Sequence, residues 1–341
     1  MVLVLVVVSA CATTRSAWDF RRELLATEAM ADRRQYAEAI EGYESLAERA
    51  EREDDLHYLR YRIAYMYEQL GDLEEALARY EAMYRNPTGS YDDYAARAMV
   101  RTARIIDREY GDRDEARRLW VGTVRTFPNT NFAEDAYREL KRDYRDRGMI
   151  PELIELLSGL HAELQNTEIA DNIVYDIGRM LHEDLDECEE AIEMYRLLTI
   201  RFQRSSLVDD ALWHIGRCYR ALGDIDREYA HLLSFVDGRE LSIILADYNY
   251  TYYNPSYKRL AEIHEERGEL RDAIAIYRRF QRTFPLSLDN DDMQYLIMRH
   301  QLTLGEPEEA VRSYRLLVRE WPESRYVRRG EQLLRDAGVE P

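Results

Sequence analysis

The chain has 341 residues, which is enough for two ordinary domains or for one long array of repeats. Hydrophobic residues make up 46% and charged residues 33%, and the formal net charge of −19 argues against binding to a nucleic-acid backbone. Leu, Ala, Glu and Arg dominate, prolines number only 8, and strand-forming residues are scarce after residue 10, so the composition predicts an all-α protein.

The N-terminus differs in character from the rest of the chain. Residues 1–10 read MVLVLVVVSA, an apolar run too short to span a bilayer, which takes about 20 residues, but typical of a secretory signal. Residues 8–11, VSAC, resemble the bacterial lipobox, in which the cysteine is lipidated and becomes the first residue after cleavage. The resemblance implies a signal peptide over residues 1–11 with Cys11 as the lipidation site. Ala12 follows, which in the enteric sorting scheme implies an outer-membrane lipoprotein that faces the periplasm.

One feature of this segment leaves an alternative open. No Lys or Arg precedes the apolar run, although secretory signals carry a basic segment there. The alternative to an exported protein is therefore a soluble cytoplasmic adaptor whose apolar N-terminus has no role in targeting.

From about residue 20 to residue 335 one phrase recurs: Gly, an acidic residue, three residues, Ala, three residues, Tyr. Gly71, Asp72, Ala76 and Tyr80 form a clear copy. Eight copies place the Ala, or its substitute, at positions 39, 76, 116, 153, 191, 228, 273 and 310, which we call the anchor positions. Gly can end a first helix in the left-handed conformation, and the acid suits the start of a second helix. The small residue lets two helices approach closely, and the ring fills the adjoining gap.

A second phrase closes most copies and predicts where the second helix ends and the next repeat begins. Pro ends a helix, and Ser or Thr is well placed to cap the following one. The copies are Phe127-Pro128-x-Thr130, Phe202-Gln203-x-Ser205, Phe284-Pro285-x-Ser287 and Trp321-Pro322-x-Ser324.

Together these phrases are identified as those of the tetratricopeptide repeat. The resemblance implies an α-solenoid of about eight helix pairs over residues 12–337, with Arg325–Ala337 as the helix that caps the last pair. The long spacing and the closing phrase resemble the repeats of BamD-type outer-membrane assembly lipoproteins and of the Tol-Pal-associated periplasmic repeat protein. This implies a scaffold that binds other proteins, with outer-membrane protein assembly as the first expected role. Pilus or secretion-system assembly is the alternative within the envelope.

The longest interval between copies, 45 residues, contains a tyrosine-rich segment. Residues 247–257 read DYNYTYYNPSY, and their β-branched and turn residues fit a helix poorly. We expect a lengthened loop between the sixth and seventh repeats, on a side where solenoids often bind partners. Tyr250, Tyr252 and Tyr253 are its candidate contact residues.

Arginines recur at one register position of the first helices, the residue after a small side chain that should face the inner groove in this fold. The arginines at or near this position are Arg104, Arg138, Arg142, Arg145, Arg179, Arg217, Arg220 and Arg299. With Tyr175 and Trp213 nearby, they predict a groove for an acidic peptide or a terminal carboxylate. The alternative is that these arginines pair with acids on neighbouring helices.

Motifs of catalysis are absent from the sequence. It contains no His-Glu-x-x-His set, phosphate-binding loop or Gly-x-Ser-x-Gly elbow, so we expect no enzyme activity and no cofactor or metal. His182, His214 and His264 are interpreted as structural residues. Cys188 and Cys218 either form a disulfide in an oxidising compartment or, as we favour, are small buried residues.

Overall fold

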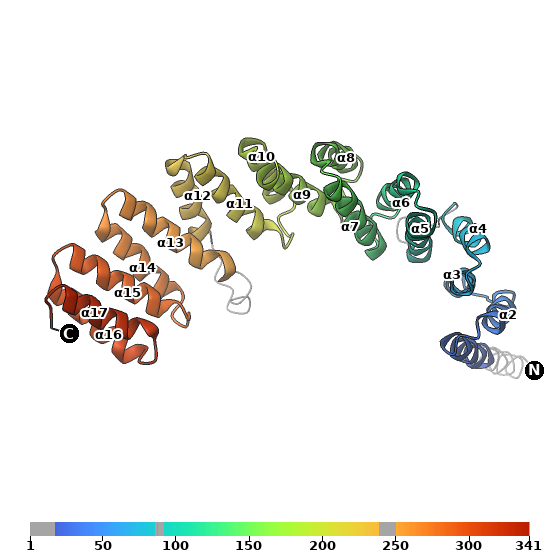
Figure 1. Ribbon diagram of the computed structural model, residues 1–341, viewed down its shortest axis with the longest axis horizontal. Helices are drawn as coiled ribbons and strands as arrows, with labels where there is room; N and C mark the ends of the chain where they lie inside the picture. Colours follow the sequence, from blue (N-terminus) through green and yellow to red (C-terminus); the bar gives the residue numbers. More distant parts are fainter. Residues whose placement is uncertain (1–17, 86, 88–91, 239–249, 341) are drawn as a thin grey trace, which may run out of the picture. The chain divides into compact units, whose positions relative to one another are not determined.

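The structure, a computed structural model, describes residues 18–85, 87, 92–238 and 250–340, and every regular element in these ranges is helical. Residues 18–32 form the first helix (Figure 1). The others are α2 (Tyr36–Ala47), α3 (Glu53–Leu70), α4 (Leu73–Tyr84), α5 (Asp93–Ile105), η1 (Ile106–Tyr110), α6 (Arg113–Thr126), α7 (Asn131–Asp146), α8 (Ile150–Glu163), α9 (Ala170–Glu183), α10 (Cys188–Arg201), α11 (Val208–Ala221), α12 (Ile225–Asp237), α13 (Tyr250–Glu266), α14 (Leu270–Thr283), α15 (Asn290–Thr303), α16 (Pro307–Glu320) and α17 (Arg325–Asp336). The predicted all-α class is confirmed. Cys11 and the rest of the predicted signal peptide lie outside the described residues.

The helices form pairs, and the turn inside each pair has one repeated backbone feature. Five residues before every anchor position the backbone is left-handed, with φ between 57° and 84°. Six of these eight positions are glycines, which adopt this conformation without strain. The other two are Arg34 and Asp186, at φ 62° and 57°. The predicted repeat register is therefore confirmed even where the sequence lacks the glycine.

Helix starts follow the predicted capping only in part. The side chains of Asp72, Asp112 and Asp224 accept hydrogen bonds from the first-turn amides of α4, α6 and α12. Thr130 caps α7 and Ser324 caps α17 in the same way. Ser205 does not cap α11 as predicted. Its hydroxyl accepts a hydrogen bond from the Leu207 amide, one residue before α11 begins.

The chain divides into two compact units, residues up to Ile173 and residues from Val174. Unit 1 holds the first four helix pairs and the first residues of α9, and unit 2 holds the rest of α9, the remaining helices and α17. Inside each unit, successive helices pack side by side, as α13, α14, α15 and α16 do in Figure 1. None of the described helices combines the length and the apolar character that crossing a membrane would require.

The anchor positions and the aromatic positions four residues later build the core. Ala39, Ala76, Ala116, Ala191, Ala273 and Ala310 are fully buried. Tyr80 and Tyr277 also donate their hydroxyls to glutamates on the preceding helix, 2.8 Å to Glu68 and 2.9 Å to Glu265. Tyrosine is common here because its ring is buried while its hydroxyl reaches a polar partner at the edge of the core.

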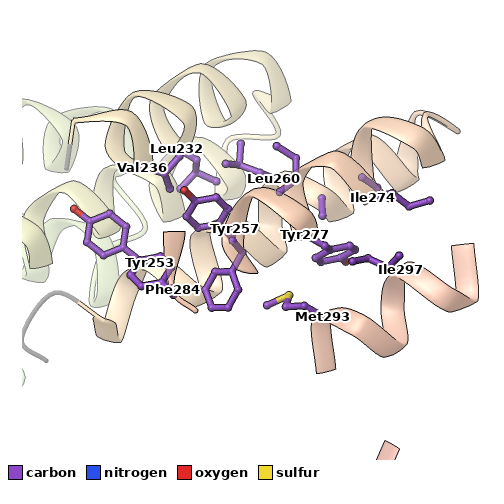
Figure 2. Close-up of a cluster of buried hydrophobic side chains, with 14 of the residues drawn as sticks. Leu232, Val236, Tyr253, Tyr257, Leu260, Ile274, Tyr277, Phe284, Met293 and Ile297 are labelled. Atoms are coloured by element: carbon purple, nitrogen blue, oxygen red, sulfur yellow. The ribbon is translucent and has the colours of Figure 1, made fainter. Parts of the chain in front are cut away.

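The prediction of a loop over residues 247–257 is wrong for the part that the structure describes. Residues 250–257 are the first two turns of α13, with Pro255 inside the helix. Figure 2 shows Tyr253 and Tyr257 among buried side chains of α12, α13 and α14. Tyr253 is only 4% exposed and stacks on Phe235, with 4.8 Å between ring centroids. The Tyr253 and Tyr257 rings lie four residues apart on one face of α13. Their packing in the core outweighs the poor helix propensity of Asn254-Pro255.

The last helix covers the end of unit 2. Leu334 of α17 is buried against Met298 and Tyr314, which come from α15 and α16. The Cβ that Gly330 lacks would lie 3.0 Å from the Tyr314 ring, so the glycine allows α17 to approach closely. Helix α17 therefore shields the apolar face of the last pair, as a capping helix does.

Candidate functional site

Two of the predicted groove arginines in unit 1 are neutralised within their own helix. On α7, Arg138 lies 3.1 Å from Asp135, and Arg142 donates to Glu139. Arg145 is exposed near the end of the same helix. Exposed pairs three residues apart are screened by water and contribute little to stability. Arg138 and Arg142 are thus paired, but within α7 and not with the neighbouring helices that the alternative named, and a binding role for them stays a prediction.

Arg104 has a different environment at the end of α5, where the chain passes into the π-helical turn η1. Together with Arg108 of η1 it lines a small cavity of about 190 Å³, whose lining also includes Arg101, Glu68 and Glu109. Arg101 pairs with Glu68, with 3.0 Å between Nε and the carboxylate. Arg104 and Arg108 make no ion pair with any residue that the structure describes. Single π-helical turns often mark functional positions, and this one leaves two cationic side chains side by side.

In unit 2 three of the four predicted groove arginines, Arg179, Arg217 and Arg299, take part in ion pairs with glutamates of the first helices. Arg179 lies 2.8 Å from Glu183 on α9, and Arg217 of α11 reaches the same carboxylate at 3.8 Å. Burial opposes ionisation of Glu183, but the hydrogen bond from Arg179 and the charges of both arginines lower its pKa overall. In the last two repeats, Arg299 of α15 likewise lies 3.4 Å from Glu265 of α13.

Three half-buried aromatic side chains form the clearest candidate surface of unit 2. We call Tyr175 of α9, Trp213 of α11 and Tyr252 of α13 the aromatic patch. The rings of Trp213 and Tyr252 stack with centroids 5.7 Å apart, and both pack with one side against the buried core of unit 2. The Tyr252 hydroxyl donates to Asp210, in the first turn of α11.

The charge around the aromatic patch is acidic. Burial and the Asp210 carboxylate raise the pKa of Tyr175 to about 12, and burial with the hydrogen bond to Asp210 raises that of Tyr252. Burial and the neighbouring Asp210 also raise the pKa of Asp209. Both tyrosines therefore keep their protons at neutral pH, and the patch presents neutral rings beside carboxylates.

The structure thus brings together residues that the sequence assigned to two different surfaces. Tyr175 and Trp213 were predicted for the groove, and Tyr252 for the tyrosine loop. Tyr253 is core rather than a contact residue, Tyr250 begins α13, and Arg220 is exposed on α11. Asp210 and Arg108 were missed. Helical spacing is the sequence pattern that could have identified them, because Asp210 precedes Trp213 by three residues and Arg108 follows Arg104 by four.

Two groups of side chains in the described ranges bring together atoms that can bind a metal. His182, Cys188 and Cys218 form a buried group, and both thiols are free. His264, Glu269 and Asp272 form a group at the turn between α13 and α14, where His264 Nδ1 lies 2.8 Å from Glu269. The sequence interpretation treated these histidines separately and expected no metal.

Profiles of the tetratricopeptide repeat match three stretches of the chain, residues 57–82, 210–237 and 258–325. These stretches coincide with the pair α3–α4, the pair α11–α12 and the two pairs from α13 to α16, so these pairs are tetratricopeptide repeats, and the fold is an α-solenoid of helix pairs. No curated protein matches the sequence significantly.

Solved structures with a similar fold include MamA, at 15% identity and a TM-score of 0.35, with 57% of this chain and 95% of that chain covered. PilW, a type IV pilus biogenesis factor, has 16% identity and a TM-score of 0.33, with 80% and 97% covered. The apo form of RapI has 12% identity and a TM-score of 0.41, with 94% and 97% covered. Similarity at this level supports no inference about the partner.

Proposed function

We propose that this chain is a lipid-anchored scaffold of the bacterial cell envelope, and that it binds partner proteins through the aromatic patch of unit 2. The observation that carries the proposal is the position of Trp213 and Tyr252. Each ring is held on one side by the core and by its neighbour, and its other side remains accessible. Rigid Trp and Tyr side chains of this kind supply most of the binding energy of many protein interfaces.

A second surface suits the acidic part of a partner. Arg104 and Arg108 line one cavity in unit 1, and guanidinium groups grip a carboxylate through two parallel hydrogen bonds. The expected ligand is still acidic, but we now place its binding site at Arg104 and Arg108, which make no ion pair within the described residues. Binding at this surface should weaken as salt rises, because exposed charges are screened beyond about 10 Å at 0.1 M.

The envelope location rests on the sequence of residues 1–11. An apolar run followed by VSAC supports lipidation of Cys11, and the repeat phrases support a role in outer-membrane protein assembly. Pilus or secretion-system assembly is the alternative use of the same scaffold, and a cytoplasmic adaptor is the alternative location. Radiolabelled palmitate should enter the wild-type protein and not Cys11→Ala. Equal labelling of the two proteins would contradict lipidation at this residue.

The aromatic patch is tested by substitution at its exposed rings. A partner is first recovered with the full-length protein from membranes, and its affinity for each purified variant is then measured by calorimetry. Trp213→Ala and Tyr252→Ser should each weaken binding by about 2 kcal/mol, or roughly 30-fold. Ile200→Ser is the matched control, since Ile200 is 71% exposed on α10, outside the patch. Unchanged affinity in both patch variants, with helix content intact, would place binding elsewhere.

A further inference from the structure

A buried cluster in unit 2 combines residues from three successive helices. His182 lies in the last turn of α9, Cys188 is the first residue of α10, and Cys218 belongs to α11. The turn from α9 to α10 passes through Asp186 in the left-handed conformation. This tight turn returns the chain so that Cys188 lies beside His182, and the packing of α11 on α10 adds Cys218.

The ligand atoms of the three side chains converge on one point. The imidazole nitrogen and the two sulfur atoms all lie within 4.8 Å of one another. In a tetrahedral zinc site, with Zn–S near 2.3 Å and Zn–N near 2.0–2.1 Å, such atoms lie about 3.6–3.8 Å apart. Small side-chain rotations therefore suffice to close the set around an ion.

A second histidine borders the same point. His214 Nδ1 lies 3.3 Å from His182 Nδ1, and two nitrogen ligands of one tetrahedral zinc ion would be about 3.4 Å apart. The His214 ring is held by stacking on Tyr195, with 5.3 Å between centroids. It can orient His182 through a hydrogen bond, as outer-shell groups of metal sites do, or approach the ion itself.

We propose that His182, Cys188 and Cys218 form a Zn²⁺ site, with His214 beside the fourth coordination position. Thiolate and imidazole ligands select soft or borderline cations such as zinc over magnesium or calcium. Binding releases one proton from each thiol to solvent, and the two thiolates then balance the double charge of the ion. The result is a neutral buried centre, which avoids the cost of burying a net charge.

The protonation states in the absence of an ion are compatible with this chemistry. Burial lowers the pKa of His182 and, together with His182 and Arg217, lowers that of His214 to about 4, so both imidazoles are neutral at pH 7. Burial and the Cys188 thiol raise the pKa of Cys218, which keeps that thiol protonated until a cation arrives. A bound cation reverses this preference and deprotonates its thiol ligands.

The Tyr195 hydroxyl beside this cluster lacks the hydrogen bond that equivalent tyrosines make in other repeats. Tyr195 is fully buried, and its hydroxyl has no hydrogen-bond partner within the described residues. The equivalent hydroxyls of Tyr80 and Tyr277 each donate to a glutamate. A buried polar atom left unpaired is costly. The fifth repeat thus has a group of histidines and thiols where the second and seventh repeats have a tyrosine–glutamate contact.

Zinc at this position would tie α9, α10 and α11 together and stiffen the junction of the fifth and sixth repeats. The inference concerns the internal structure of unit 2 and holds whether or not the aromatic patch binds a partner. Because zinc binds the folded state, unit 2 should be more stable with zinc than after chelation.

The site is tested on the full-length, reduced protein with Zn²⁺ and with Co²⁺ as a spectroscopic probe. We expect one equivalent of zinc per chain and a thiolate-to-cobalt charge-transfer band. Both should be lost in Cys188→Ser and in Cys218→Ser. His214→Ala should lower zinc affinity by about 10- to 100-fold, as outer-shell substitutions do. Cys11→Ala is the matched control and should bind zinc like the wild type. Loss of zinc uptake in His264→Ala, with uptake retained in Cys188→Ser, would instead assign the metal to the group at the turn between α13 and α14.

A measurement on the unsubstituted protein covers the case in which a cysteine variant fails to fold. Zinc should slow alkylation of Cys188 and Cys218, and a chelator should restore it. Two results would overturn the proposal. One is equal metal uptake by the wild type and the Cys188→Ser/Cys218→Ser double variant. The other is a reduced wild-type protein that takes up no zinc, whether or not its two thiols become linked in a disulfide under air.

Discussion

Glu228 shows how a single residue can depart from the repeat pattern and still be tolerated. It occupies an anchor position where most repeats have Ala, and it is 1% exposed. Arg259 of α13, itself buried, donates two hydrogen bonds to its carboxylate at 2.7 and 2.9 Å. A buried carboxylate is acceptable only with such a partner, because its desolvation is otherwise uncompensated.

Removal of one partner of this ion pair should be far more costly than removal of both. Arg259→Met leaves the Glu228 carboxylate buried and unpaired, so we expect a loss of about 3–5 kcal/mol in urea unfolding of unit 2. The double variant Glu228→Ala/Arg259→Met should recover most of that loss. Arg138→Ala, which breaks an exposed pair, is the control and should change stability by about 0.5 kcal/mol or less. A cost for Arg259→Met similar to that of the control would refute the buried-pair account.

His231 gives unit 2 a pH dependence whose sign is fixed by its surroundings. Its Nε2–H donates to the Leu212 carbonyl at 2.7 Å, and burial, with the charge of Arg196, lowers its pKa below the usual 6.5. The unfolded chain then binds a proton more readily than the folded one, so this stabilisation is present above pH 6.5 and is lost as pH falls. Urea unfolding between pH 7 and 5 should show a steeper loss for the wild type than for His231→Gln. Parallel curves would show that His231 does not contribute.

At the scale of elements, α13 separates what local sequence can predict from what packing decides. The Gly-acid-Ala-Tyr spacing predicted the pairing of helices and the register of every turn. It could not predict that residues 250–257 are helical, because Asn254-Pro255 opposes a helix locally and the stabilising contacts come from α12 and α14. The aromatic patch could not be predicted for the same reason, because Tyr252 contacts Trp213 only if this segment is a helix. The pairing of Arg217 with Glu183 likewise depends on a residue one repeat away.

Adjacent tyrosines of α13 should therefore respond differently to the same substitution. Tyr253→Ser removes a buried ring stacked on Phe235 and should cost about 3–5 kcal/mol, as other large-to-small core substitutions do. Tyr252→Ser removes a half-buried ring and should cost less stability while it weakens partner binding. Hydrogen exchange should show loss of protection for Tyr253→Ser in α12, α13 and α14 rather than in unit 1, because each repeat is stabilised by its neighbours. Equal destabilisation by the two substitutions would contradict the assigned roles.

At the scale of the whole molecule, the repeats separate stability from recognition. The residues at the anchor and aromatic positions are buried in the core of each unit. Most described arginines of the first helices form ion pairs with acidic residues. The aromatic patch lies on the first helices α9, α11 and α13. Arg104 and Arg108, which make no ion pair within the described residues, lie at the end of α5 and in η1. A binding surface built this way can change without loss of the fold, because each repeat depends mainly on its neighbours for stability.

The most direct test of the proposed scaffold function is site-specific photo-crosslinking in intact membranes. A photoreactive residue is placed at position 213, at position 252, or at position 200 as the exposed control on α10. The account predicts that positions 213 and 252 crosslink to the same partner protein and that position 200 does not. Crosslinks from position 200 alone, or none from either patch position while a partner still co-purifies, would contradict binding through the aromatic patch.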